Sequence, residues 1–105
     1  MTLPVVVRLE AQAELVEAWG WYETQRSGLG DELLGCLEAA IGRAGRDPTL
    51  HAITHGDVRR VLVRRFPYAV FYAVEGAQII VLAIAHVRRE PLYWLDRVAV
   101  PSIRT

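Results

Sequence analysis

The chain has 105 residues, of which 52% are hydrophobic, so it can form one small domain with a core of its own. Its formal net charge is zero, which excludes a uniformly basic nucleic-acid-coating protein. The charges are unevenly distributed, since residues 1–57 hold nine acids and four arginines (net −5) and residues 58–105 hold three acids and eight arginines (net +5). This asymmetry indicates two surfaces with different partners. All twelve basic residues are arginine, which reflects either a GC-rich genome or a use of arginine's planar fork for phosphate and carboxylate.

The first predicted element is a strand over residues 1–8, where β-branched residues follow Pro4. A helix is predicted over residues 10–26. Its apolar residues recur at helical spacing and so share one face: Leu15, Trp19 and Tyr22. Its acidic residues lie on another face, which we expect to be exposed to water: Glu10, Glu14 and Glu17.

A second helix is predicted over residues 31–46, with Asp31 at its positive end and Asp47-Pro48 as its stop signal. Its apolar stripe consists of Leu33, Leu34, Leu37, Ile41 and Ala44. A second stripe of small residues contains Gly35, Ala39 and Gly42. It indicates either close approach by another backbone or sequence drift on a helix that is held in place by its other face. Cys36, the single cysteine, also lies on an apolar face, so we expect a buried thiol and no disulfide.

After a loop that contains His51 and His55, three strands are predicted over residues 58–66, 68–75 and 78–86. The last is almost continuously apolar, so we expect it to be the central strand, buried on both faces. The order predicts an α+β fold: an N-terminal strand, a helix hairpin and a three-stranded antiparallel meander, with the helices on one sheet face. We expect one domain over residues 1–95 and a C-terminal tail over residues 96–105.

The segment "RRVLVRRFPYAVFY" begins at Arg59 and concentrates charge more than any other part of the chain. Because side chains alternate along a strand, burying Val61 and Val63 against the helices leaves Arg60 and Arg64 on the open sheet face. These arginines, beside the tyrosines of the next strand, form either a surface for nucleic acid or an ordinary solvated face.

His86, Arg88 and Arg89 cluster at the end of the last strand, where side chains converge into clefts. His86 is either a structural histidine or a base, although no nucleophile or carboxylate partner is recognised. The chain contains no phosphate-binding loop, no dinucleotide fingerprint and no metal-ligand spacing, so we expect neither cofactor nor metal. No signal peptide and no run of about 18 apolar residues is recognised, so we expect a cytoplasmic protein without a membrane partner.

Three segments together resemble the RelE/ParE superfamily of bacterial toxins: "WYETQRSGLGDELL", "FPYAVFY" and "LAIAHVRREP" followed by a tryptophan. The resemblance covers nearly the whole chain, from Val5 to Trp94. It implies the toxin of a type II toxin–antitoxin pair, held in a heteromeric complex by a cognate antitoxin. We expect the antitoxin to contact exposed apolar surface, including the stripe of Gly35, Ala39 and Gly42 and the edge strands.

The superfamily resemblance implies one of two activities, inhibition of DNA gyrase (ParE-like) or ribosome-dependent cleavage of mRNA (RelE-like). Arg60 and Arg89 match basic positions of the mRNA-cutting members. Leu62 and Ala69 stand where such members carry further basic residues, and Leu95 falls near the position of their terminal tyrosine. Each missing cation removes about 2–4 kcal/mol of transition-state stabilisation.

We therefore favour a ParE-like gyrase inhibitor, with a ribosome-dependent mRNA endonuclease or an inactive toxin-fold binding module as alternatives. Whether the protein is an enzyme stays open at this point. If it is a nuclease, the candidate catalytic residues are Arg60, Arg64, His86, Arg89 and Tyr93.

Overall fold

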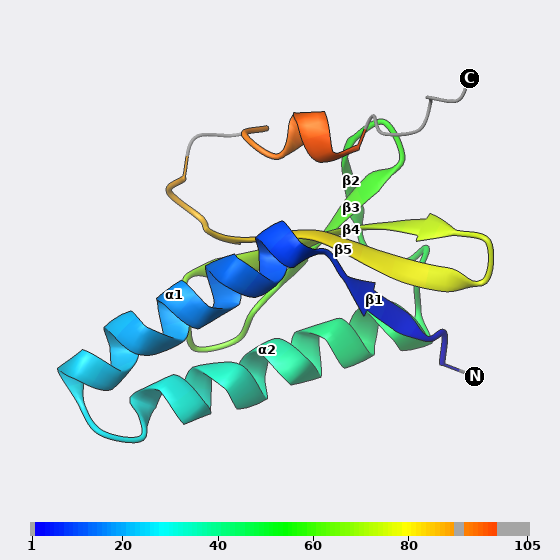
Figure 1. The fold of residues 1–105 in the computed structure, drawn as a ribbon. Coiled ribbons are helices and arrows are strands. Elements are labelled where there is room, and N and C mark those ends of the chain that lie inside the picture. Colours follow the sequence, from blue (N-terminus) through cyan, green and yellow to red (C-terminus); the bar gives the residue numbers. More distant parts are fainter. Residues whose placement is uncertain (1, 90–91, 99–105) are drawn as a thin grey trace.

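The computed structural model describes residues 2–89 and 92–98 of the chain (Figure 1). Its elements are β1 (Val5–Val7), α1 (Leu9–Gln25), α2 (Leu29–Arg46), β2 (Ala52–His55), β3 (Val58–Leu62), β4 (Tyr68–Glu75), β5 (Gln78–His86) and the 3-10 helix η1 (Leu95–Arg97). Neither described α-helix is long and apolar enough to cross a membrane. Most of the predicted tail, residues 99–105, lies outside the described part, so the boundary between domain and tail stays a prediction.

The strands form one five-stranded sheet in the order β1-β5-β4-β3-β2. The β1–β5 pair is parallel, and every other pair is antiparallel. The hairpin of α1 and α2 covers one face of the sheet, and η1 lies on the opposite side (Figure 1). The predicted α+β fold is therefore confirmed, including the N-terminal strand, the helix hairpin and the antiparallel meander.

Three details of the sheet differ from the prediction. The expected loop around His51 and His55 contains the strand β2, which pairs with β3 through an irregular register. β3 ends at Leu62 instead of Phe66, because the chain turns at Arg65 in the left-handed region with φ of 73°. β5 is buried along both faces as expected, but β4 occupies the middle of the sheet.

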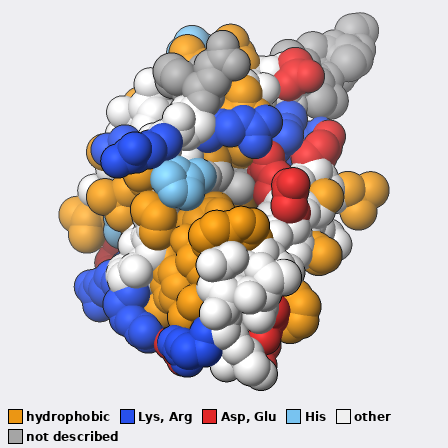
Figure 2. Space-filling model, turned by 90° about the vertical axis from the view of Figure 1, so that its left-hand side faces the viewer, with side chains coloured by type: hydrophobic (Ala, Val, Ile, Leu, Met, Phe, Trp, Pro, Cys, Tyr) orange, Lys and Arg blue, Asp and Glu red, His pale blue; other side chains and the backbone are white. Residues whose placement is uncertain are grey.

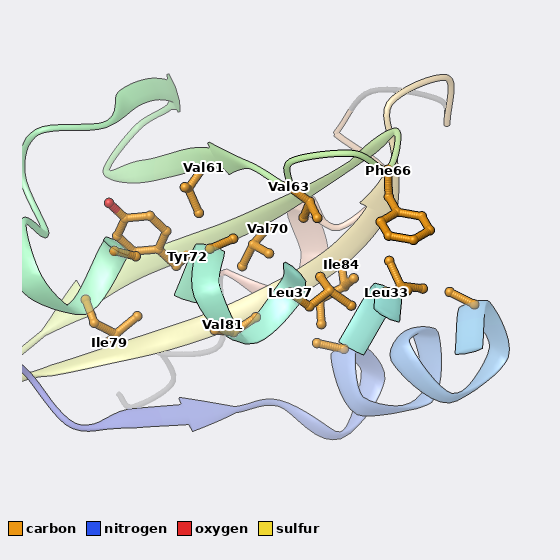
Figure 3. Close-up of a cluster of buried hydrophobic side chains, with 14 residues drawn as sticks. Leu33, Leu37, Val61, Val63, Phe66, Val70, Tyr72, Ile79, Val81 and Ile84 are labelled. Atoms are coloured by element: carbon orange, nitrogen blue, oxygen red, sulfur yellow. The ribbon is translucent and has the colours of Figure 1, made fainter. Parts of the chain in front are cut away.

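The main core lies between the helix hairpin and the sheet (Figure 3). α2 contributes Leu33 and Leu37, and the strands contribute alternate residues such as Val61 and Val70. Burying each such side chain stabilises the fold by about 1.5–3 kcal/mol. The fully buried Tyr72 donates a hydrogen bond from its hydroxyl to the carbonyl of Pro48 at 2.8 Å, so its polar end is satisfied.

A second, smaller core lies on the other face of the sheet. It contains Val58, Ala73, Ile80, Leu82, Ala83 and Trp94. Trp94 is only 1% exposed, and its ring lies 5.1 Å from the ring of Phe71, measured between centroids. This face, which we expected to be partly open, is thus covered in part by the segment that leads into η1.

Two glycines of α2 allow a matched test of helix packing. Gly30 lies against α1, and a Cβ added there would come within 2.7 Å of the Trp19 carbonyl oxygen. Gly35 has open space around it, so its stripe receives no backbone from the described chain. We expect Gly30→Ala to lower the free energy of unfolding by about 1–3 kcal/mol, because the helices must move apart. We expect Gly35→Ala to raise it by about 0.5–1 kcal/mol through helix propensity.

Urea unfolding followed by circular dichroism measures both changes. If the urea midpoint of Gly30→Ala rises as much as that of Gly35→Ala, the junction between α1 and α2 tolerates a side chain at position 30.

Candidate functional site

A hollow of about 370 Å³ brings together four of the five predicted site residues, namely Arg60, His86, Arg89 and Tyr93. It lies on the sheet face away from the helix hairpin. β3 contributes Arg60, the end of β5 contributes His86, and the segment after β5 contributes the other two. Ala69 of β4 lies in the same lining. The hollow therefore brings two arginines, a histidine and a tyrosine to one concave surface.

The fifth predicted residue, Arg64, lies elsewhere. Because β3 ends at Leu62, Arg64 lies beyond the strand and does not line the hollow. Arg64 lines a separate groove together with Arg43, His51 and Arg60. The expectation that Arg64 continues the open face of β3 is therefore wrong, although its role stays untested.

Glu14 of α1 is largely buried, and the expectation that it is exposed to water is wrong. Its side chain is 15% exposed, as is that of Arg97. Its carboxylate accepts hydrogen bonds from the Ile84 backbone N–H at 2.9 Å, from the Tyr93 hydroxyl at 2.6 Å and from both Arg97 Nη atoms at 3.2 Å. Arg97 also donates to the Leu82 carbonyl at 2.9 Å. This network fastens the C-terminal segment to α1 and β5.

The hydrogen-bond network and the neighbouring Arg89 fix the protonation and the position of Tyr93. Burial, followed by the hydrogen bond to Glu14, raises the pKa of its hydroxyl. The Arg89 guanidinium lies over the Tyr93 ring at 3.9 Å from its centroid, in a cation–π contact. Both residues are therefore held by the protein's own contacts.

His86 is oriented by its neighbours. Its Nδ1 atom accepts a hydrogen bond from the Arg88 backbone N–H at 3.0 Å, so in the neutral ring the proton is on Nε2. Its ring also meets the edge of Tyr68 at 5.4 Å between centroids. His86 lines two hollows, the one described above and a second one beside α1.

The second hollow, of about 360 Å³, is rich in aromatic side chains. Trp21 and Tyr22 of α1 lie in its wall with Tyr68 and His86. Figure 2 views the molecule from this end and shows hydrophobic side chains at the centre, with a histidine and basic side chains around them. Within the described residues, no three side chains of the metal-ligating types come close enough to hold a metal ion.

Glu14, Trp94 and Arg97 were missed as site-building residues. For Glu14 a signal exists, because Ala11 and Ala18 lie one turn before and after it on the same face, and both are buried. Two small residues beside a carboxylate leave space for a partner from elsewhere in the chain. Arg97 gave no such signal, since its position in a short terminal segment carries no periodicity.

A family model described as the ParE toxin of the type II toxin–antitoxin system parDE matches residues 5–91. The chain belongs to the ParE toxin family. This confirms the resemblance and the preference for its ParE-like side. Membership of the ParE family makes the chain a toxin of the type II class.

Among solved structures, a chain from the chromosomal ParDE toxin–antitoxin system of P. aeruginosa is similar to it, with a TM-score of 0.72 and 16% sequence identity. The match covers 81% of this chain and 96% of that chain. At this identity the likeness concerns the fold alone. A search of curated proteins returned no match.

Proposed function

We propose that this ParE-family chain arrests growth by inhibiting DNA gyrase in the cytoplasm, and that a cognate antitoxin binds and neutralises it. The observation that carries the choice of gyrase over RNA is the engagement of Tyr93. Its hydroxyl is bonded to Glu14, and its ring lies under Arg89. A nuclease needs an acid and several cations that point at the scissile phosphate. Here the candidate acid, Tyr93, and the candidate cation, Arg89, are packed against each other.

The lining of the hollow supports the same choice. Ala69 stands within it where a nuclease of the superfamily would carry a cation, and Leu62 replaces a second basic residue of β3. The raised pKa of Tyr93 keeps its hydroxyl protonated, and the bond to Glu14 keeps that proton away from a leaving oxygen. Without a free acid, the two arginines and His86 that line the hollow are too few for strong stabilisation of a phosphorane-like transition state.

The convergence of Arg60, His86 and Arg89 on one hollow favours RNA cleavage as a second candidate. The two functions predict opposite effects of one variant. We expect the double variant Arg60→Ala/Arg89→Ala to arrest growth as the wild-type chain does, and to inhibit supercoiling by purified gyrase with less than a threefold change in potency. The reason is that a protein–protein contact with gyrase does not depend on a phosphate-directed pair.

The measurement compares growth after induction, gyrase supercoiling and cleavage of a translated mRNA on ribosomes. Arg88→Ala, an exposed arginine that lines neither hollow, is the matched control. If the wild-type chain cuts mRNA on ribosomes and the double variant does not, gyrase inhibition is the wrong activity. An inactive binding module would give no growth arrest with either chain.

Antitoxin binding is supported by exposed apolar side chains on the helix hairpin. Leu9 and Val16 of α1 are 77% and 67% exposed, and they lie two turns apart on one face. Trp21 is exposed farther along the same helix. A small domain seldom leaves such residues uncovered unless a partner binds them. Co-purification of the chain with the product of the neighbouring gene tests this contact.

A further inference from the structure

Five arginines around β3 and the C-terminal end of α2 have no carboxylate partner among the described residues. They are Arg43, Arg46, Arg59, Arg60 and Arg64. The carboxylates of the ion pairs seen in residues 2–89 and 92–98 lie instead on α1 and the first turn of α2. Positive charge without a paired carboxylate is therefore concentrated around β3 and the C-terminal end of α2, although the chain as a whole is neutral.

Three of these arginines line one groove of about 360 Å³, together with His51 and short stretches of β2 and β3. We call this the arginine groove; its charged members are Arg43, Arg60 and Arg64. Its lining contains no carboxylate. Two neighbouring contacts fix its walls, since Arg43 Nη2 donates to the Leu62 carbonyl at 2.6 Å and Arg59 Nη1 donates to the His51 carbonyl at 2.7 Å.

The positive charges crowd one another. Burial lowers the pKa of Arg43, and the nearby Arg64 and Arg46 lower it further. The C-terminus of α2 offsets part of this charge, because Arg43 and Arg46 lie in its last turn, where the helix dipole supplies about half a negative charge. Asp47 follows directly but forms no ion pair with a described arginine. A net positive groove remains, and it fits an anionic ligand.

The residues that line the groove indicate which anion it binds. Val61 and Val63 are turned into the helix-side core, and the exposed apolar members are only Ala52 and Leu62. So small an apolar surface is a poor anchor for a protein partner. Apart from His51, it has no aromatic surface on which the bases of a single strand could stack. Guanidinium forks match phosphate oxygens without either feature.

We propose that the arginine groove binds the phosphodiester backbone of duplex DNA without reading its sequence. The groove shares Arg60 with the hollow that holds Arg89 and Tyr93, but its other lining residues are different. The proposal does not depend on which cellular target the toxin inhibits. The zero net charge of the whole chain does not indicate this nucleic-acid contact, because the acidic residues elsewhere offset the arginines of the groove.

The test measures binding of the full chain to a fluorescein-labelled duplex of about 20 base pairs by anisotropy. With three phosphate contacts the affinity should fall about 40-fold between 50 and 200 mM salt, since each contact contributes a slope of about −0.9. We expect Arg64→Gln to weaken binding to all duplex sequences alike and to reduce the slope by about 1. Arg88→Gln removes the same charge away from the groove and should change neither quantity.

Unchanged thermal unfolding of Arg64→Gln shows that the variant is folded. Competition identifies the ligand: inorganic phosphate should displace the duplex only at millimolar concentration, and single-stranded DNA or RNA of equal length should compete less well than duplex. Equal effects of Arg64→Gln and Arg88→Gln, stronger binding of a single strand, or preferential binding of polyglutamate would each overturn the proposal.

Discussion

Replacing Glu14 by alanine is expected to lower the free energy of unfolding by about 3 kcal/mol. The change removes one partner of an ion pair whose side chains are each 15% exposed, and it leaves the guanidinium of Arg97 without its counter-charge. The Ile84 N–H and the Tyr93 hydroxyl lose their acceptor at the same time. With a slope of about 1–3 kcal/mol per molar urea, the midpoint of unfolding should fall by about 1–3 M.

Glu17→Ala is the matched control, because Glu17 lies one turn farther along α1 and is exposed. Its effect should stay within about 0.5 kcal/mol. Tyr93→Phe, which removes a single hydroxyl from the network, should cost about 1 kcal/mol. If Glu14→Ala proves as mild as Glu17→Ala, the carboxylate does not hold the C-terminal segment, and packing alone must do so.

Trp94→Ala is expected to cost about 3–5 kcal/mol, the range for deleting a fully buried aromatic side chain. Trp94 fills the smaller core between Phe71 and the residues of β5, and its removal opens that sheet face to water. Since small domains have about 5–15 kcal/mol of total stability, the loss should be a large part of the whole. We expect a lower urea midpoint and faster proteolysis after β5.

Leu95→Ala serves as its control, because Leu95 is exposed next to Trp94 and should contribute little. Combining Glu14→Ala with Trp94→Ala provides a further check. Both residues hold the same segment, so the double variant should lose at least 0.5 kcal/mol less than the sum of the two single losses. Strict additivity would show that the two contacts act on independent parts of the structure.

The parts of the fold that follow from local pattern were predictable. The alternation of Val61 and Val63 with Arg60 and Leu62 identified the buried face of β3, because a pleated strand repeats every two residues. The helix hairpin followed from apolar spacing and from the "SGLG" break. Gathering Arg60, His86, Arg89 and Tyr93 at one hollow required the motif resemblance as well, since they come from separate segments.

The wrong predictions for Glu14 and β2 share a physical cause, because the contacts that decide them come from residues far away in the sequence. Glu14 reads as a solvated residue until Arg97 is brought to it by the fold. β2 has four residues between Pro48 and Gly56, too few for a period to show, and its pairing with β3 defines it. The end of β3 depends on a left-handed residue, Arg65, and arginine gives no local signal for that conformation.

The parallel pairing of β1 with β5 also has a consequence for how the chain folds during synthesis. Val5 is paired with Ile79, more than seventy residues farther along the chain. At roughly 5–20 residues per second, a ribosome needs several seconds to make the partner of the first strand. The helix hairpin must wait through that time with its apolar face uncovered, because the sheet that buries it is made last. The β1–β5 pair therefore closes only after β5 has left the ribosome, and the long sequence separation of the two strands slows this step.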